Sequence, residues 1–421
     1  MNSLREARFL ASDEGREALA RLSDPGDAPT PSGRSRDLLA LSKDARKLVG
    51  SDRAPALLTQ LELRSRARAK FARAEQMLFT RDALEQASAE EVARYRARRF
   101  EGARLVVDAG CSIGGDLLAL ASVAPTIGID LDATRLFLAR ENLRVHDLAP
   151  ASQRLVAADA RRFDIDADGL FADPARRDDA RKRIVELDEI RPPFRTFAAR
   201  LDRIPRIGVK LSPAVDVDRL PQAAEVELIS VRGECREAVA WMGELRTCAR
   251  RATLLPSGET FTARDEAARR VDVPVRGAAT WLFDPDPSLI RAGLLLPFAE
   301  RHGLDRVDPH LAYLTGERVP ESGFVRAYRV IESFRFGLKE LRRRVRQHGI
   351  GRLEIKKRGF PIVPEELRRK LRLDGERAMT LILARIHDRH EAFLTEAVGD
   401  TPPAPSRGED APCSDDRSGT S

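Results

Sequence analysis

The 421-residue chain has little cysteine and no long apolar run, and each shortage excludes classes of protein. Its 4 cysteines form no C-x-x-C pair and have no regular spacing. We therefore expect reduced thiols, and neither a disulfide framework nor a zinc or other metal site. No window approaches the roughly 18 uninterrupted apolar residues of a membrane span. The N-terminal stretch MNSLREARFLASDEGREAL is charged throughout and lacks the apolar core of a secretory signal. These features predict a cytoplasmic protein without a membrane partner.

The most informative segment that is present covers residues 105–121, LVVDAGCSIGGDLLALA. An apolar β-branched run leads into a glycine turn and then into an apolar helix, with the order Asp108, Gly110, Ser112, Gly114. A dinucleotide site has the pattern G-x-G-x-x-G, with the pyrophosphate at the helix N-terminus. Here Ser112 takes the middle glycine position and an acid lies upstream. This order favours a ligand with an amino group over one with a second phosphate. A glycine-rich turn by itself can also occur without binding any ligand.

Three further apolar strands end in an acid. TIGIDLD (126–132) ends in Asp130, about 20 residues beyond Gly110, where a doubly wound fold places the carboxylate that binds ribose hydroxyls. RLVAADA (154–160) ends in Asp159, which could accept from an adenine amine, and GLFADPARR (169–177) carries Asp173-Pro174. Each acid alone could be a helix N-cap or a turn residue. Three in chain order predict a ligand site at the carboxyl edge of a sheet.

Later strands are expected at 206–212, 225–231 and 251–256, which brings the predicted strands to seven, alternating in part with helices. The sequence therefore predicts an α/β fold. Lys210, in VKLSP, either lines the ligand pocket or forms a salt bridge at the sheet edge.

Residues 1–100 are expected to be helical, interrupted by the Pro-, Gly- and Ser-rich loop at 23–35. We interpret this region as a helical cap over the ligand pocket. An alternative makes it part of a substrate groove, because Lys70, Arg73 and Arg81 lie in it.

Positive charge is concentrated near the C-terminus. Residues 324–388 contain 18 Lys+Arg and 8 Asp+Glu, a net charge of +10, whereas the whole chain carries +7. A helix with an apolar stripe is followed there by RLEIKKRG, which alternates as a half-buried strand. Such a basic module suits a phosphate backbone, and the alternative is a solvated basic face. With no aromatic-rich platform visible, we expect backbone or duplex contact rather than base stacking. The candidate RNA-binding residues are Arg343, Arg346, Lys356, Lys357 and Arg358.

The motifs DAGCSIGGD, FADPARR, VKLSP and GRLEIKKRG, in this order, resemble a bacterial family of class I S-adenosylmethionine (SAM)-dependent methyltransferases with a C-terminal THUMP-like domain. The resemblance covers about Lys70 to Ile386. It implies a Rossmann-like, seven-stranded methyltransferase domain at 101–273 behind the N-terminal helical region. A small ferredoxin-like segment would follow at 274–323, then a small α+β THUMP-like module at 324–388. Residues 399–421 are rich in Pro, Ser and Gly and have almost no large apolar residues, so we expect a disordered tail, with the bounds 389–421. The implied cofactor is SAM, bound by Asp108, Gly110, Ser112, Gly114, Asp130 and Asp159.

The predicted chemistry centres on Asp173-Pro174-Ala175-Arg176. Nitrogen methyltransferases often have Asp/Asn-Pro-Pro-aromatic here, and Arg176 replaces the aromatic residue that would stack on a base. We take Asp173, Pro174 and Arg176 as the candidate catalytic residues. Catalysis by a cysteine nucleophile is less favoured, because Cys235 and Cys248 lack a recognisable setting. The resulting prediction is SAM-dependent methylation of a base in structured RNA, either tRNA or rRNA. A small-molecule or protein acceptor, and a non-catalytic SAM- or RNA-binding protein, remain as alternatives.

Overall fold

The computed structural model describes residues 3–23, 38–148, 153–174, 186–263, 271–386 and 389–398. The chain divides into two compact units. The N-terminal unit comprises Met1–Val215 and Val239–Arg246, and the C-terminal unit comprises Asp216–Ala238 and Thr247–Ser421. Within the described residues, no helix is both long enough and apolar enough to cross a membrane.

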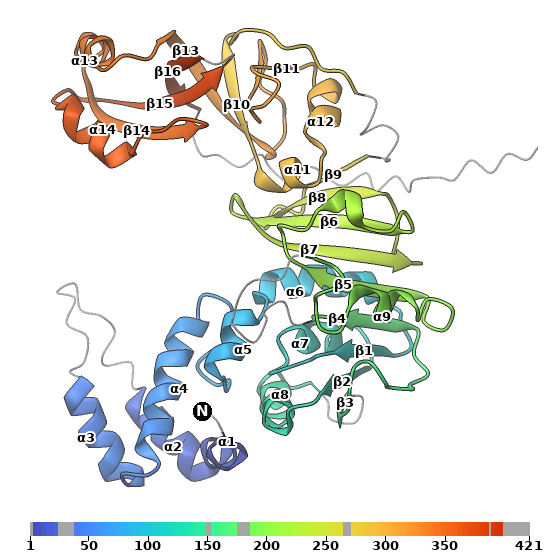
Figure 1. Cartoon of the computed structure of the whole chain (residues 1–421). Coiled ribbons are helices and arrows are strands. Elements are labelled where there is room, and N and C mark those ends of the chain that lie inside the picture. The colour runs from blue at the N-terminus through green and yellow to red at the C-terminus, as the bar shows by residue number, and fades with distance from the viewer. Residues whose placement is uncertain are drawn as a thin grey trace, which may run out of the picture. The chain divides into compact units, whose positions relative to one another are not determined.

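Among the described residues, six α-helices precede the first strand of the N-terminal unit (Figure 1). Serine caps begin two of them, since Ser3 and Ser12 accept from backbone N–H groups of the first turns. The buried side chains of the first five join those of α7 (Gly115–Ala121) and α8 (Ala133–Val145) in one hydrophobic core. The six are α1 (Leu4–Ala11), α2 (Asp13–Leu22), α3 (Leu38–Val49), α4 (Ala54–Ala67), α5 (Arg81–Gln86) and α6 (Glu90–Ala97).

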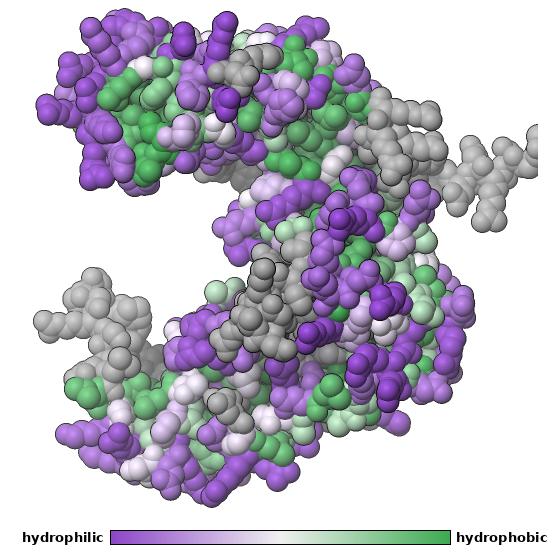
Figure 2. All heavy atoms as spheres, in the orientation of Figure 1, coloured by the Kyte–Doolittle hydropathy of each residue, from purple (hydrophilic) through white to green (hydrophobic). Residues whose placement is uncertain are grey.

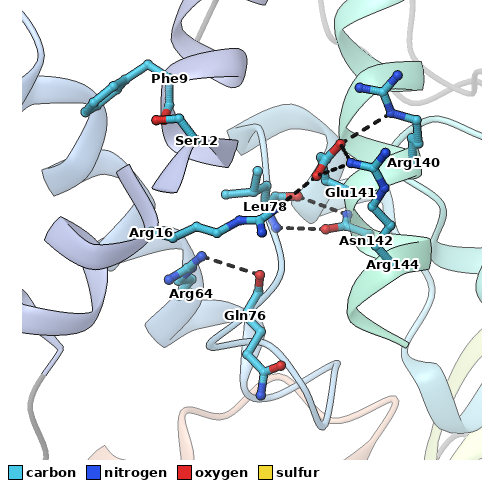
Figure 3. Close-up of polar contacts among 10 residues, drawn as sticks. All are labelled: Phe9, Ser12, Arg16, Arg64, Gln76, Leu78, Arg140, Glu141, Asn142 and Arg144. Carbon is cyan, nitrogen blue, oxygen red and sulfur yellow. Dashed lines mark hydrogen bonds and ion pairs between the residues drawn. The ribbon is translucent and has the colours of Figure 1, made fainter. Parts of the chain in front are cut away.

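Polar contacts also tie this helical region to α8 (Figure 3). Glu141 is buried in α8 and accepts from Arg16 of α2 at 3.0 Å and from Arg144 at 2.9 Å. The neighbouring Asn142 accepts from the Leu78 backbone N–H at 2.8 Å and donates to the Leu78 carbonyl at 3.1 Å. A buried carboxylate or amide is costly unless it is satisfied in this way, so these contacts fix the helices in one arrangement.

Structural partners are present for Lys70, Arg73 and Arg81, the basic side chains of the alternative substrate groove. The Lys70 ammonium donates to the carbonyls of Leu84 and Ala87, both at 2.8 Å, and so caps the end of α5. Arg73 binds the end of α8 through the Val145 carbonyl. Arg81 pairs with Glu62 of α4 at 2.9 Å. These three side chains thus contact neighbouring helices or helix ends.

The first sheet has nine strands in the order β3-β2-β1-β4-β5-β7-β6-β8-β9. Strand β1 lies between β2 and β4 and is parallel to both, with Val106 opposite Thr126 and Gly169. The chain reverses its direction of strand addition at β1, and such a switch point leaves a crevice at the carboxyl ends of the strands. The strands are β1 (Val106–Ala109), β2 (Thr126–Asp130), β3 (Gln153–Ala157), β4 (Gly169–Ala172), β5 (Arg206–Leu211), β6 (Ala224–Val231), β7 (Glu234–Gly243), β8 (Arg250–Leu255) and β9 (Thr260–Ala263). The short helix α9 (Phe194–Ala198) precedes β5.

The strands expected at 206–212, 225–231 and 251–256 are present as β5, β6 and β8. Strand β7, which lies between β6 and β8 in the sequence, was missed. Its sequence ECREAVAWMG begins with charged residues and continues as a buried run from Glu237 to Met242. It therefore has neither the alternation nor the β-branched bias on which strand prediction depends.

The second sheet lies in the C-terminal unit and has seven strands in the order β11-β12-β10-β13-β16-β15-β14. Helices α13 (Leu338–Gln347) and α14 (Pro364–Leu371) share a hydrophobic core with β14, β15 and β16. The strands are β10 (Trp281–Pro285), β11 (Asp305–Arg306), β12 (Leu314–Gly316), β13 (Val325–Arg335), β14 (Ile350–Arg358), β15 (Arg377–Ile386) and β16 (Arg389–Ala397), with α11 (Pro287–Arg291) and α12 (Leu295–Arg301) after β10.

This sheet revises the predicted organisation of the C-terminal region. Strand β10 of the 274–323 segment pairs with β13 of the 324–388 module, from Trp281 opposite Arg329 to Pro285 opposite Val325. The two predicted modules are therefore parts of one sheet. The expected disordered tail is wrong for residues 389–397, because β16 lies between β13 and β15 with Ala392, Phe393 and Leu394 buried. The rest of the predicted tail, from residue 399 on, lies outside the described residues.

Candidate active site

The site is built on the turn that follows β1. Gly110 and Gly114 have φ angles of +90° and +93°, which side chains disfavour, and Ser112 has φ +50°. A Cβ at Gly110 would lie 3.3 Å from the carbonyl oxygen of Asp173. The glycine turn and the segment after β4 therefore approach each other closely, as the pairing of β1 with β4 requires.

Asp108 is the central acid of this site. It is 1% exposed, and neither of its carboxylate oxygens has a hydrogen-bond partner among the described residues. Burial raises the pKa of this carboxyl well above its ordinary range, and the nearby acids Asp116, Asp173 and Asp130 raise it further. A cationic ligand would compensate such a cluster, because it would satisfy the orphaned oxygens and neutralise their mutual repulsion.

Asp116 belongs to this cluster, although the sequence did not single it out. It lies in the first turn of α7 and forms an ion pair with Arg96 of α6, which is 2% exposed. The Arg96 guanidinium also lies over the ring of Phe171, 4.9 Å from its centre. The run RYRARRF gives no sign that one of its arginines is buried, because the pairing joins residues 20 positions apart.

Asp130 ends β2, beside β1. Its carboxylate accepts from the backbone N–H groups of Ser112 and Asp132, both at 2.9 Å. These bonds hold the glycine turn against the end of β2. They use one lone pair of each oxygen, so the carboxylate can still accept from hydroxyl groups of a ligand.

Asp159 lies two residues beyond the end of β3, and Arg161 of the same loop binds its carboxylate. Arg161 binds it through the guanidinium at 2.6 Å and through its backbone N–H at 2.8 Å. These hydrogen bonds lower the pKa of Asp159 to about 2. The expected contact with an adenine amine would therefore have to use the lone pairs that Arg161 leaves.

Asp173 is held by Lys210. The Lys210 ammonium lies 2.7 Å from the Asp173 carboxylate and 3.5 Å from the carbonyl of Gln86, and the lysine is 1% exposed. Lys210 thus forms the salt bridge considered above, at the carboxyl end of β5 and next to the candidate acceptor site. Pro174 is buried beside it, and Arg176 lies outside the described residues. Within the described residues, no cluster of His, Cys, Asp and Glu is arranged to hold a metal ion.

The basic candidates of the C-terminal unit divide into different environments. Lys356 and Arg358 bind the same carboxylate, Asp284 of β10, at 3.0 and 2.6 Å. Lys357 donates to the Ile362 carbonyl at 2.7 Å. The three candidates at 356–358 therefore do not share one face, because successive side chains of β14 point to opposite faces of the sheet.

The two candidates on α13 also differ from each other. Arg343 is paired with Glu340, whereas Arg346 is exposed and forms no ion pair with any described residue.

Known proteins share both parts of this architecture. Residues 325–397 match the family model of a THUMP domain-like region. Two relatives from Mycobacterium tuberculosis, of strains CDC 1551 / Oshkosh and H37Rv, are named uncharacterized SAM-dependent methyltransferases. Each is 39% identical over 353 residues, which cover 80% of this chain and 94% of the relative. A crystal structure of a candidate methyltransferase from Porphyromonas gingivalis W83 has a TM-score of 0.74 and 22% identity, covering 94% of this chain and 99% of that one.

A sheet with β1 at a switch point, followed by an acid-bearing glycine turn, defines a class I methyltransferase fold, and the Porphyromonas structure has the same overall fold. The mycobacterial relatives show that this chain belongs to the family of SAM-dependent methyltransferases. It is an enzyme with SAM as its cofactor, and it carries a THUMP-like domain near its C-terminus. The predicted α/β fold and cofactor are confirmed.

Proposed function

We propose that this enzyme methylates a base of structured RNA, of the tRNA or rRNA class. The observation that carries the proposal is the basic THUMP-like domain, whose helices present cations that no acid neutralises. The exposed Lys and Arg side chains of this domain that form no ion pair with a described residue include Arg335, Lys339, Arg346, Arg352, Arg369, Lys370 and Arg372. In Figure 2 the surfaces over α13 and α14 are mostly hydrophilic, with hydrophobic residues between them. Such cations suit phosphates, whose neutralisation dominates the affinity of proteins for nucleic acids.

The residues of the glycine turn fit the cofactor. SAM supplies an electrophilic methyl group and carries positive charge on its sulfonium and ammonium groups. The orphaned carboxylate of Asp108 would accept from the ammonium, and the surrounding acids Asp116 and Asp173 would stabilise its charge. Asp130 would accept from the ribose hydroxyls. Gly110, Ser112 and Gly114 would let the main chain approach the ligand closely, and Asp159 would lie at the adenine amine.

Asp173 would orient the acceptor. Its carboxylate is 20% exposed and therefore reachable, whereas its partner Lys210 is buried. An acceptor nitrogen whose N–H donates to Asp173 would have its own lone pair aligned toward the methyl group of SAM. Such alignment supplies much of the acceleration in methyl transfer. Asp173 would then take the acceptor proton late in the reaction. Pro174 would shape the segment that presents this carboxylate, and we expect Arg176 to contact the base or a phosphate.

The proposal is tested by transfer of label from methyl-tritiated SAM to total RNA taken from cells that lack the gene. Label in one RNA size class with the wild-type protein, and none with Asp173→Ala, is the expected result. Protein and small-molecule fractions of the same cells serve as parallel acceptors. Label in either of those fractions, with none in RNA, would contradict the RNA assignment and support another acceptor.

A further inference from the structure

Three rings from distant parts of the sequence meet at one end of the second sheet. Phe336 follows β13, Phe360 follows β14 and His390 lies at the start of β16. The rings of Phe336 and Phe360 are 4.9 Å apart and nearly perpendicular, and those of Phe360 and His390 are 4.5 Å apart. The Phe336 backbone N–H donates to the His390 carbonyl at 2.7 Å, which fixes the two segments together. We call Phe336, Phe360 and His390 the aromatic corner.

The aromatic corner is only partly core. Phe360 is 7% exposed and packs with the hydrophobic residues under α13 and α14, so it serves as the base of the cluster. Phe336 is half-buried and His390 is exposed, so part of each ring remains accessible at the surface. A flat, partly apolar surface of this kind is what a nucleic-acid base stacks on.

Cations border the aromatic corner on the same face of the sheet. Alternation along β14 places Lys357 on the face of the buried Ile355, and alternation along β15 places Arg385 on the face of the buried Leu383. Arg385 is also directly opposite His390 in the pairing of β15 with β16. Both cationic side chains are exposed.

The nearest acid of the adjoining helix is already engaged. Glu340 lies in the first turn of α13, near Gly337, and is bound by Arg343 and Arg344. The charge at this end of the sheet is therefore complementary to phosphates.

We propose that the aromatic corner binds an unpaired nucleotide of RNA, with the base stacked on Phe336 and His390 and the flanking phosphates held by Lys357 and Arg385. The proposal rests on the proposed function and makes it more specific, because it adds recognition of a single-stranded segment to contact with the backbone. The sequence could not indicate it, since the three rings are 24 and 30 residues apart and meet only through the sheet.

The test measures binding of a fluorescein-labelled single-stranded oligoribonucleotide of about 12 residues, and of a duplex of the same length, to the full chain. The variants Phe336→Leu and His390→Ala remove one stacking ring each, and Lys357→Gln removes a cation. His310→Ala is the matched control for the histidine, because His310 is also exposed in the C-terminal unit. Arg318→Gln is the control for the lysine, because Arg318 is exposed in the C-terminal unit but lies outside the THUMP-like region at 325–397.

We expect each ring variant to weaken single-strand binding about tenfold, the loss typical of one base–aromatic stack, with much less change for the duplex. The controls should remain within about twofold of the wild type, since a single exposed cation or ring outside the site contributes little. A 4-thiouridine in the oligonucleotide should crosslink to the peptide carrying Phe336 or His390, and this result does not depend on the stability of a variant.

Two outcomes would overturn the proposal and are distinguishable. Wild-type binding of RNA with unchanged affinity in the ring variants, or a crosslink elsewhere, would reject the aromatic corner and leave the RNA assignment standing. No binding of either probe, and no methyl transfer to RNA, would reject both.

Discussion

The ammonium of Lys210 lies 2.7 Å from the carboxylate of Asp173, and Lys210 is 1% exposed whereas Asp173 is 20% exposed. A buried cation therefore holds an acid that the solvent, and hence an acceptor, can reach. The pair joins β5 to the segment after β4, at the edge of the sheet where the Asp108 cluster also lies. Lys210 is thus a positioning residue for the acid that we assign to the acceptor.

Replacement of Lys210 should impair methyl transfer more than cofactor binding. In Lys210→Met the Asp173 carboxylate loses its orienting partner, and we expect kcat to fall about 100-fold, the scale of a lost acid–base contribution. SAM affinity, measured by calorimetry, should remain within a few-fold of the wild type. Lys210→Arg should recover part of kcat, because it keeps the charge. An equal loss of SAM affinity and kcat would argue against a positioning role.

Asp108→Asn should have opposite effects on the free and the SAM-bound protein. The raised pKa of Asp108 means that its ionised form is unfavourable in the ligand-free fold, so this group lowers stability as pH rises above the ordinary carboxyl range. The asparagine variant should therefore raise the unfolding free energy near pH 7 relative to the wild type, and this difference should shrink as the pH falls toward the ordinary carboxyl range. Thermal unfolding measured from about pH 5 to about pH 8 determines this difference.

The same substitution should weaken SAM binding, because the amide removes the negative charge that would face the ammonium. We expect a loss of about tenfold or more, as for a charge-assisted hydrogen bond. Asp52→Asn, on an exposed turn, is the control and should change neither quantity. A variant that binds SAM as tightly as the wild type would remove Asp108 from the cofactor site.

Asp284→Ala should destabilise the C-terminal unit and leave RNA binding intact in the molecules that remain folded. The substitution leaves Lys356 and Arg358 partly buried without their shared carboxylate. We expect a loss of about 2–3 kcal/mol in unfolding free energy, somewhat below the range for breaking a fully buried pair. Urea unfolding followed by circular dichroism measures the stability, and anisotropy with labelled RNA at 10 °C, roughly where stability is maximal, measures binding. Unchanged stability with weakened RNA binding would mean that Lys356 and Arg358 face RNA after all.

Local sequence patterns predicted the part of the site that lies near each strand end. The order Asp108, Gly110, Ser112, Gly114 and the position of Asp130 follow from strand–turn–helix units, in which neighbours in sequence are neighbours in space. The partners of these residues could not be predicted in the same way. Arg96 reaches Asp116 from a helix, and Asp284 reaches Lys356 across 72 residues, so both contacts depend on how elements pack.

The same reason explains the errors in the fold. Strand β7 has no alternating pattern, because its inner residues are buried on both faces. Strand β16 lies in the segment that was expected to be a disordered tail, yet pairing with β13 and β15 stabilises it. Tertiary context overrides weak local preference in such strands.

The central claim, that the THUMP-like domain brings RNA to the SAM site, is tested most directly by a triple variant of its helices. Arg346→Gln, Arg369→Gln and Lys370→Gln together remove three exposed cations, and Arg8→Gln, Arg46→Gln and Lys47→Gln remove three from the N-terminal unit as a control. The measurement is the rate of methyl transfer from tritiated SAM to unmethylated RNA, with SAM affinity determined in parallel. We predict that the helix variant loses at least about tenfold in transfer at low RNA concentration with unchanged SAM affinity, while the control keeps its rate. Equal rates for the two triple variants would contradict the claim.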